Sequence, residues 1–160
     1  MVKNKQTKIP TKTKILDAAL TLFNEHGCGP ISTNHIAKEC GISAGNLYFH
    51  YANKSEIIRA LYEKMLTDWD EMQAKIPMDG DVMSYIKGLL ALAANHYYEY
   101  RFIHRELVTL CMDDEALDVR NKEVITRRKK ENTMILSMLV ARKYLRELSA
   151  DEIEFLVDMT

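Results

Sequence analysis

A short stretch near the N-terminus, AGNLYFHYANKSE (residues 44–56), sets four ring side chains in a row and follows them with an amide and an ammonium group. The rings are Tyr48, Phe49, His50 and Tyr51. They cannot all lie on one face of a helix, because successive residues point about 100° apart. Some of them must therefore face away from any core. Phenol, imidazole and ammonium groups donate hydrogen bonds, and phosphate oxygens are acceptors that suit such a set.

Two predicted helices precede this stretch and help to position it. Apolar residues at helical spacing predict a first helix from Thr13 to about Glu25, which Gly27 ends. A second, short helix begins at Thr33, whose hydroxyl we expect to cap it. Gly41 ends the second helix in a left-handed backbone conformation, which glycine adopts more easily than other residues.

The turn after the second helix is only three residues long, Gly41-Ile42-Ser43. Ser43 caps a third helix that runs through His50. A tight turn between two short helices is typical of the helix-turn-helix arrangement. With Leu47 facing the shared core, its neighbours Ala44, Gly45, Asn46 and Tyr48 lie mainly outside. We expect Phe49 and Tyr51 to wedge this three-helix head onto a long fourth helix.

The fourth helix begins after Asn53, and Glu56 lies three residues further on, which is a capping-box arrangement. A single apolar stripe continues from Lys54 to Lys75, which is about 33 Å of helix at about 1.5 Å per residue. The opposite face is charged. This helix therefore joins the head to the rest of the chain.

The rest of the chain also has helical patterns, at residues 85–98, 102–111 and 121–146. The first of these segments is apolar almost all round, which predicts a helix buried on several sides. Ser149 and Glu152 form another capping box, which opens a last helix. Because no strand-like alternation is found, the predicted fold class is all-α.

Positive charge is concentrated at the front of the chain, although the formal net charge is only −1. Residues 1–62 hold eight Lys/Arg against four Asp/Glu, and residues 63–160 hold fourteen against nineteen. The three cysteines show no C-x-x-C spacing, which excludes a zinc knuckle and fits a reducing cytosol. No apolar run is long enough to span a bilayer. We expect a cytoplasmic protein with no membrane partner.

On a helix-turn-helix frame, the outward residues of the third helix fit DNA. Asn46 offers an amide donor and acceptor to a base edge, and the small residues before it permit a close approach. Tyr48, His50 and Lys54 can donate to phosphate oxygens. Each of these residues, taken singly, is more often an ordinary surface or packing residue. Two further residues would hold the DNA backbone on the other side of the groove: Thr33 and Asn34.

The stretch ISTNHIAKECGISAGNLYFHYANK (residues 31–54) resembles the DNA-binding signature of the TetR family of bacterial transcriptional regulators. It contains a T-x-x-I-A core, a G-[IV]-S turn, an L-Y-x-H-[FY] recognition helix and an N-K start to the fourth helix. The resemblance covers roughly residues 11–62. It implies DNA contacts at nine residues: Thr33, Asn34, Ser43, Ala44, Gly45, Asn46, Tyr48, His50 and Lys54.

The same resemblance implies a domain plan and a mode of action. We expect a flexible basic tail at residues 1–10, a helix-turn-helix DNA-binding domain at 11–53 and a helical effector-binding and dimerisation domain at 54–160. The family's dimer helices come last, and this chain stops near the start of one, so we expect a domain truncated at its C-terminal end. The implied function is a homodimeric repressor that a small, largely apolar effector releases from a palindromic double-stranded DNA operator, without a cofactor.

Candidate effector-binding residues are ring and methionine side chains of the second half, because methionine lines adaptable pockets as well as filling gaps. They are Trp69, Met72, Tyr97, Tyr100, His104 and Met138. Each of them alone is more often an ordinary core residue. A metal site at His96, His104 and Cys111 is not expected, because their spacing makes no recognised ligand pair.

Two other classes of function stay open at this point. A helical protein-interaction module would pack its helix-turn-helix against another protein and would bind DNA without a preferred sequence. An enzyme would need a nucleophile–base pair or a phosphate-binding loop. Neither is found in the sequence, so we expect no enzymatic activity.

Overall fold

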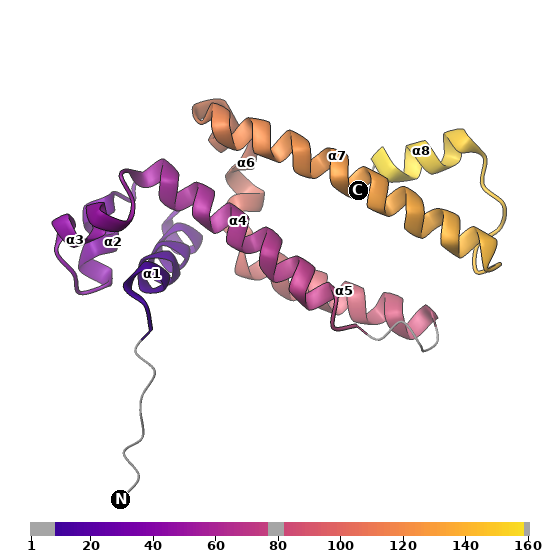
Figure 1. Cartoon of the computed structure of the whole chain (residues 1–160), viewed down its shortest axis with the longest axis horizontal. Helices are drawn as coiled ribbons and strands as arrows, with labels where there is room; N and C mark the ends of the chain where they lie inside the picture. Colours follow the sequence, from indigo (N-terminus) through magenta and orange to yellow (C-terminus); the bar gives the residue numbers. More distant parts are fainter. Residues whose placement is uncertain (1–8, 77–81, 159–160) are drawn as a thin grey trace, which may run out of the picture. The chain divides into compact units, whose positions relative to one another are not determined.

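The computed structural model describes residues 9–76 and 82–158, and these ranges contain eight α-helices and no strand (Figure 1). The all-α prediction is confirmed. The chain divides into two compact units, Met1–Leu107 and Val108–Thr160. The predicted basic tail lies outside the described residues except for Ile9 and Pro10. No helix in the described part of the chain is long and apolar enough to cross a membrane.

The first unit begins with the predicted three-helix head. Its helices are α1 (Thr11–His26), α2 (Thr33–Glu39) and α3 (Ala44–His50), and Figure 1 shows them gathered beside the N-terminal end of α4 (Lys54–Gln73). α1 contacts both α2 and α4, and α2 contacts α3. Five apolar residues form the fully buried core of this head: Ile15, Ala19, Phe23, Ile36 and Leu47.

The helix ends show which local predictions were right. Asn53 caps α4 by accepting a hydrogen bond from the Glu56 amide, as predicted. The cap of α2, however, is Ser32 and not Thr33, because the Ser32 hydroxyl accepts from the His35 amide. The His35 ring completes the box, since its Nδ1 accepts from the Ser32 amide at 3.2 Å.

Two further helices follow, and the boundary between the two units falls within the second of them. α5 (Val82–Glu99) packs against α4, and α6 (Arg101–Asp113) follows after the single residue Tyr100. The predicted burial of α5 on several sides is wrong: Leu90, Tyr97 and Tyr98 are each more than half exposed. An apolar surface all round a helix favours burial on every side, but burial also requires neighbouring elements on each side.

The second unit consists of the end of α6, the long α7 (Glu115–Ala141) and α8 (Ala150–Asp158). α8 folds back beside α7, and an ion pair of 2.7 Å joins Lys129 to Asp158. The predicted capping box of the last helix is confirmed. The Ser149 hydroxyl accepts from the Glu152 amide, and the Glu152 carboxylate accepts from the Ser149 amide.

Gly41 gives the first testable prediction, because it has a φ of 65° after the last turn of α2. Its amide donates to the Lys38 carbonyl, and the Ile42 amide donates to the Ala37 carbonyl, which closes the helix. Gly41→Ala should lower the free energy of unfolding by about 1–2 kcal/mol, since other residues are strained there. Urea unfolding measures the change.

The matched control is Gly45→Ala within α3, where the backbone has no positive φ and a Cβ would meet nothing within 4 Å. Removing a glycine from a helix should hold or raise stability, by about 0.5–1 kcal/mol. Equal stability of the two variants would contradict the left-handed requirement at Gly41.

Candidate nucleic-acid interface

α3 is oriented by one buried residue and one cap. Leu47 is fully buried, and the Ser43 hydroxyl accepts a hydrogen bond from the Asn46 amide at 3.2 Å. The opposite side of the helix carries Gly45 and Asn46, both exposed. Among the described residues, nothing binds the side-chain amide of Asn46. Its donor and acceptor are therefore available to another molecule.

The predicted DNA-contacting residues all reach the surface of the head, and none is buried. The exposed ones are Asn34, Ser43, Gly45, Asn46 and Tyr48, and the half-buried ones are Thr33, Ala44, His50 and Lys54. The structure thus brings the set together on α2, α3 and the start of α4.

Tyr48 is hydrogen-bonded to the first residue of α2. Its hydroxyl lies 2.9 Å from the Thr33 hydroxyl, so that the two share one hydrogen bond and leave further donor and acceptor capacity. A shallow hollow opens beside this pair, between the α1–α2 loop (residues 27–32) and the start of α4. It is lined by Gly29, Pro30, Ile31, Ser32, Thr33, Tyr48, Ala52, Asn53 and Lys54.

Lys54 has a structural role that the sequence did not reveal. Its ammonium group donates to the carbonyl of Cys28 at 2.7 Å and to that of Ile31 at 3.0 Å, with the Gly29 carbonyl more distant at 3.5 Å. The side chain therefore fastens the α1–α2 loop to the start of α4. These bonds use donors that we expected to be free for phosphate, so its contact with DNA stays a prediction.

Replacing this ammonium group tests the structural role. Lys54→Met should lower the free energy of unfolding by about 1–3 kcal/mol, because carbonyls of the loop lose a charged donor. Lys38→Met is the matched control, since Lys38 is exposed on α2, and it should change stability by less than about 0.5 kcal/mol. Urea midpoints of the two variants that coincide would contradict the role.

The burial of the four consecutive ring residues differs from our expectation at one position. Tyr51 is buried, at 4% exposure, as predicted. Phe49 is 85% exposed, so the prediction that it wedges the head onto α4 is wrong. At about 100° per residue, Phe49 lies nearly opposite the buried Leu47, and this helical spacing is the signal that would have placed it outside.

The C-terminal end of α1 is bonded to the junction of α5 and α6, through contacts that sequence reasoning missed. The buried Asn24 donates from Nδ2 to the Glu99 carbonyl at 2.7 Å and accepts from the Phe102 amide at 3.1 Å. The Glu106 carboxylate accepts from the Cys28 amide at 3.0 Å. Burial, and then the Glu106 carboxylate, raise the pKa of the Cys28 thiol to about 12.

The predicted effector-binding residues of the first unit form two ring groups. Trp69 and Tyr100 flank His96, whose ring lies 5.5 Å and 5.0 Å from theirs. The His96 ring also bonds to the Met65 carbonyl. On the exposed side, Tyr97 stacks on His104 at 4.3 Å. Partial burial, and then the nearby His96, lower the pKa of His104, which favours its neutral form.

The remaining two predicted effector residues, Met72 and Met138, belong to different units. Met72 is half-buried on α4, and Met138 lies half-buried on α7 in the second unit.

The Tyr100 hydroxyl already has a hydrogen-bond partner, since it donates to the Asp68 carboxylate. Burial, and then this bond, raise the pKa of Tyr100. Its position in the core fits a structural role.

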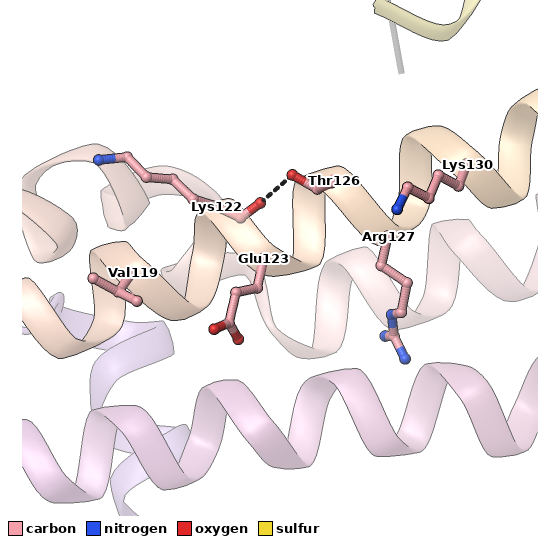
Figure 2. Close-up of a pocket in the computed structure, with 6 residues that line it drawn as sticks. All are labelled: Val119, Lys122, Glu123, Thr126, Arg127 and Lys130. Carbon is pink, nitrogen blue, oxygen red and sulfur yellow. Dashed lines mark hydrogen bonds between the residues drawn. The ribbon is translucent and has the colours of Figure 1, made fainter.

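A surface hollow runs along α7 and is lined by none of the predicted effector residues (Figure 2). Its residues are Val119, Lys122, Glu123, Thr126, Arg127 and Lys130. The Thr126 hydroxyl donates to the Lys122 carbonyl at 2.9 Å, so it is satisfied within the helix. Four of its six lining residues carry charged groups at the ends of their side chains. In the described part of the chain, no group of His, Cys, Asp or Glu is placed to hold a metal ion.

Comparison with known proteins decides the family. Residues 15–61 match the family described as "Bacterial regulatory proteins, tetR family", and residues 61–160 match one described as "Bacterial transcriptional repressor". The chain belongs to the TetR family of bacterial transcriptional regulators. This family consists of regulators and not of enzymes, which confirms the expectation that the chain is no enzyme.

Individual TetR-family relatives match over different lengths. The chain is 31% identical over 145 residues to the transcriptional regulator UidR of Escherichia coli K12, which covers 89% of this chain and 69% of UidR. It is 35% identical over 92 residues to the regulator AcrR of Shigella flexneri, which covers 55% of this chain and 42% of AcrR. The chain thus spans less than half of AcrR and about two thirds of UidR.

Solved TetR-family structures share the fold. A regulator from Marinobacter aquaeolei VT8 superposes with a TM-score of 0.84 at 31% identity, covering 93% of this chain and 73% of that one. The match includes the helix-turn-helix head and the helical part that follows it, so the predicted fold class, an all-α chain with an N-terminal helix-turn-helix, is confirmed.

Proposed function

We propose that this chain is a sequence-specific DNA-binding repressor that acts as a homodimer. The observation that carries the proposal is the outward face of α3. Leu47 holds the helix in the core, while Gly45 and Asn46 face outward beside a tethered Tyr48. A helix held in this way can enter the major groove and present its first turn to base edges. Membership of a family of transcriptional regulators supports the same conclusion.

Each residue type on this surface has a defined task in the proposal. Gly45 lets the helix backbone approach the bases, and the Asn46 amide reads one of them, with adenine the base that it pairs with best. The Thr33–Tyr48 hydroxyl pair donates to a phosphate at the groove wall. Two heads in a dimer would read half-sites about 34–36 Å apart on a palindromic operator.

We further propose that a small, largely apolar effector weakens this binding. α4 supports the idea, because its 20 residues run from Lys54 in the head to the ring group around His96. The bonds of Asn24 and Glu106 give a second connection from the α5–α6 segment to the end of α1. A protein of the same fold, SmeT, has been solved in complex with triclosan. A hundredfold effect on affinity requires about 2.7 kcal/mol of coupling.

Selection of sites from a random double-stranded DNA library tests the DNA-binding proposal. We expect one enriched palindrome, two chains per site and a steep loss of affinity as salt rises, because phosphate contacts release counterions. Enrichment of no sequence would overturn the proposal and favour a protein-interaction module. Tyr48→Phe should weaken binding to the selected site, whereas Tyr144→Phe, at an exposed tyrosine in the second unit, should not.

Lys54 is tested separately through the salt dependence of affinity. A direct phosphate contact predicts that Lys54→Met lowers the slope of log K against log salt by about one unit, compared with Lys38→Met. If Lys54 acts only by fastening the loop, affinity falls with the slope unchanged.

The effector proposal is contradicted if ligands that bind the chain leave its operator affinity unaltered.

A further inference from the structure

Phe49 is the most exposed of the large apolar side chains recorded in the described residues, at 85%. It lies at the end of α3, directly after the tethered Tyr48. Its ring lies 5.2 Å from that of its neighbour His50 and nearly perpendicular to it. The core of the head is complete without it, because Leu47 fills the inward position.

The face that Phe49 occupies follows from helix geometry. At about 100° per residue, Gly45 and Phe49 both point within about 20° of the direction opposite Leu47. Asn46 and Tyr48 lie on either side of this line, each about 80° away from it. Phe49 therefore continues the line of Gly45 one turn later, about 6 Å along the helix axis. A molecule that contacts Gly45 and Asn46 along α3 also meets the Phe49 ring.

We propose that Phe49 reads a thymine in each half of the operator, by apolar contact with the 5-methyl group. This inference rests on the proposed function, which places the same face of α3 in the major groove. The thymine methyl is the apolar group that base edges present there, and phenylalanine is among the side chains that contact it. A phenyl ring offers neither charge nor hydrogen bond, so it does not suit a phosphate.

The expected change in DNA affinity follows from the burial of the thymine methyl group. Burying one methyl is worth about a fourfold change in affinity, and a well-packed contact reaches about tenfold. Cytosine lacks the methyl group and presents an amine beside the same position. Phe49 would thus set a preference for T over C at one position per half-site, without fixing the other positions.

The test replaces thymine by deoxyuridine, one position at a time, in the site selected by the wild-type chain. Deoxyuridine removes only the methyl group and keeps the base pair. We expect a four- to tenfold loss of affinity at one thymine of each half-site. Phe49→Ala should lose the same factor on the thymine site and should no longer respond to deoxyuridine there. Tyr144→Ala removes an exposed ring outside the head and should keep the full response.

The possible results separate the two proposals. If the wild-type chain selects no site, the proposed function fails and the thymine contact fails with it. If the chain selects a site but Phe49→Ala binds as tightly as wild type, only the thymine contact is overturned. It is also overturned if Phe49→Ala binds more weakly yet keeps the deoxyuridine response, since the ring would then touch sugar or another base. Unfolding midpoints confirm that each variant is folded.

Discussion

Gly45→Glu is expected to weaken operator binding at least about 100-fold, or about 2.7 kcal/mol, while leaving the head folded. Gly45 points away from Leu47, and a Cβ there would meet nothing within 4 Å. An acid in the first turn of a helix is favoured by the helix dipole. The same carboxylate would be pushed against base edges between two rows of phosphates, where both its volume and its charge oppose binding.

Two controls isolate the cause of this loss. Gly45→Ala adds only a methyl group, so it should cost far less affinity than the glutamate. Asn95→Asp adds one negative charge to an exposed position of α5 and should leave binding within about twofold. Fluorescence anisotropy with the selected site, together with urea unfolding, gives both quantities. Retention of wild-type affinity by Gly45→Glu would mean that this face of α3 does not meet DNA.

Asn24→Ala is expected to lower the free energy of unfolding by about 2–4 kcal/mol, although Asn24 belongs to no predicted site. Its amide satisfies the Glu99 carbonyl and the Phe102 amide at the point where α5 gives way to α6. Phe102 is fully buried, so its amide would lose its partner without gaining water. Leaving buried groups unpaired costs about 1–3 kcal/mol each.

Thermal unfolding should show this loss as a fall of about 4–16 °C in the midpoint. Asn95→Ala removes an exposed asparagine from α5 and should change stability by less than about 0.5 kcal/mol. Asn24→Asp keeps an acceptor for the Phe102 amide but sets a carboxylate against the Glu99 carbonyl, so it should also destabilise. A midpoint for Asn24→Ala equal to that of Asn95→Ala would show that the junction holds without this side chain.

Local sequence signals predicted the head well, because its helix ends depend on neighbours in the chain. Gly41 has the expected left-handed conformation, and Asn53 caps α4 as expected. The choice of Ser32 over Thr33 as the cap of α2 was missed, since two adjacent residues both carry hydroxyls. The His35 side chain, which bonds back to the Ser32 amide, decides between them.

Contacts between residues distant in sequence were not predictable in the same way. The ammonium of Lys54 bonds carbonyls more than 20 residues earlier, and Asn24 meets Phe102 across 78 positions. Nothing in the local pattern of either residue indicates these partners. Phe49 is a different case, since its exposure follows from helical spacing alone and was missed by treating the ring as a packing group.

Lys54 and Glu106 fasten the α1–α2 loop, so the reactivity of Cys28 in this loop reports how often the loop opens. Cys28 as a whole residue is 4% exposed and its thiol has a raised pKa, so a thiol reagent reaches the sulfur only while the loop is open. With the more accessible Cys40 and Cys111 replaced by serine, the labelling rate relative to the unfolded chain gives the open fraction. Lys54→Met should speed this labelling, and bound operator DNA should slow it. The labelling rate of one thiol therefore measures how often the segment that joins α1 to α2 opens.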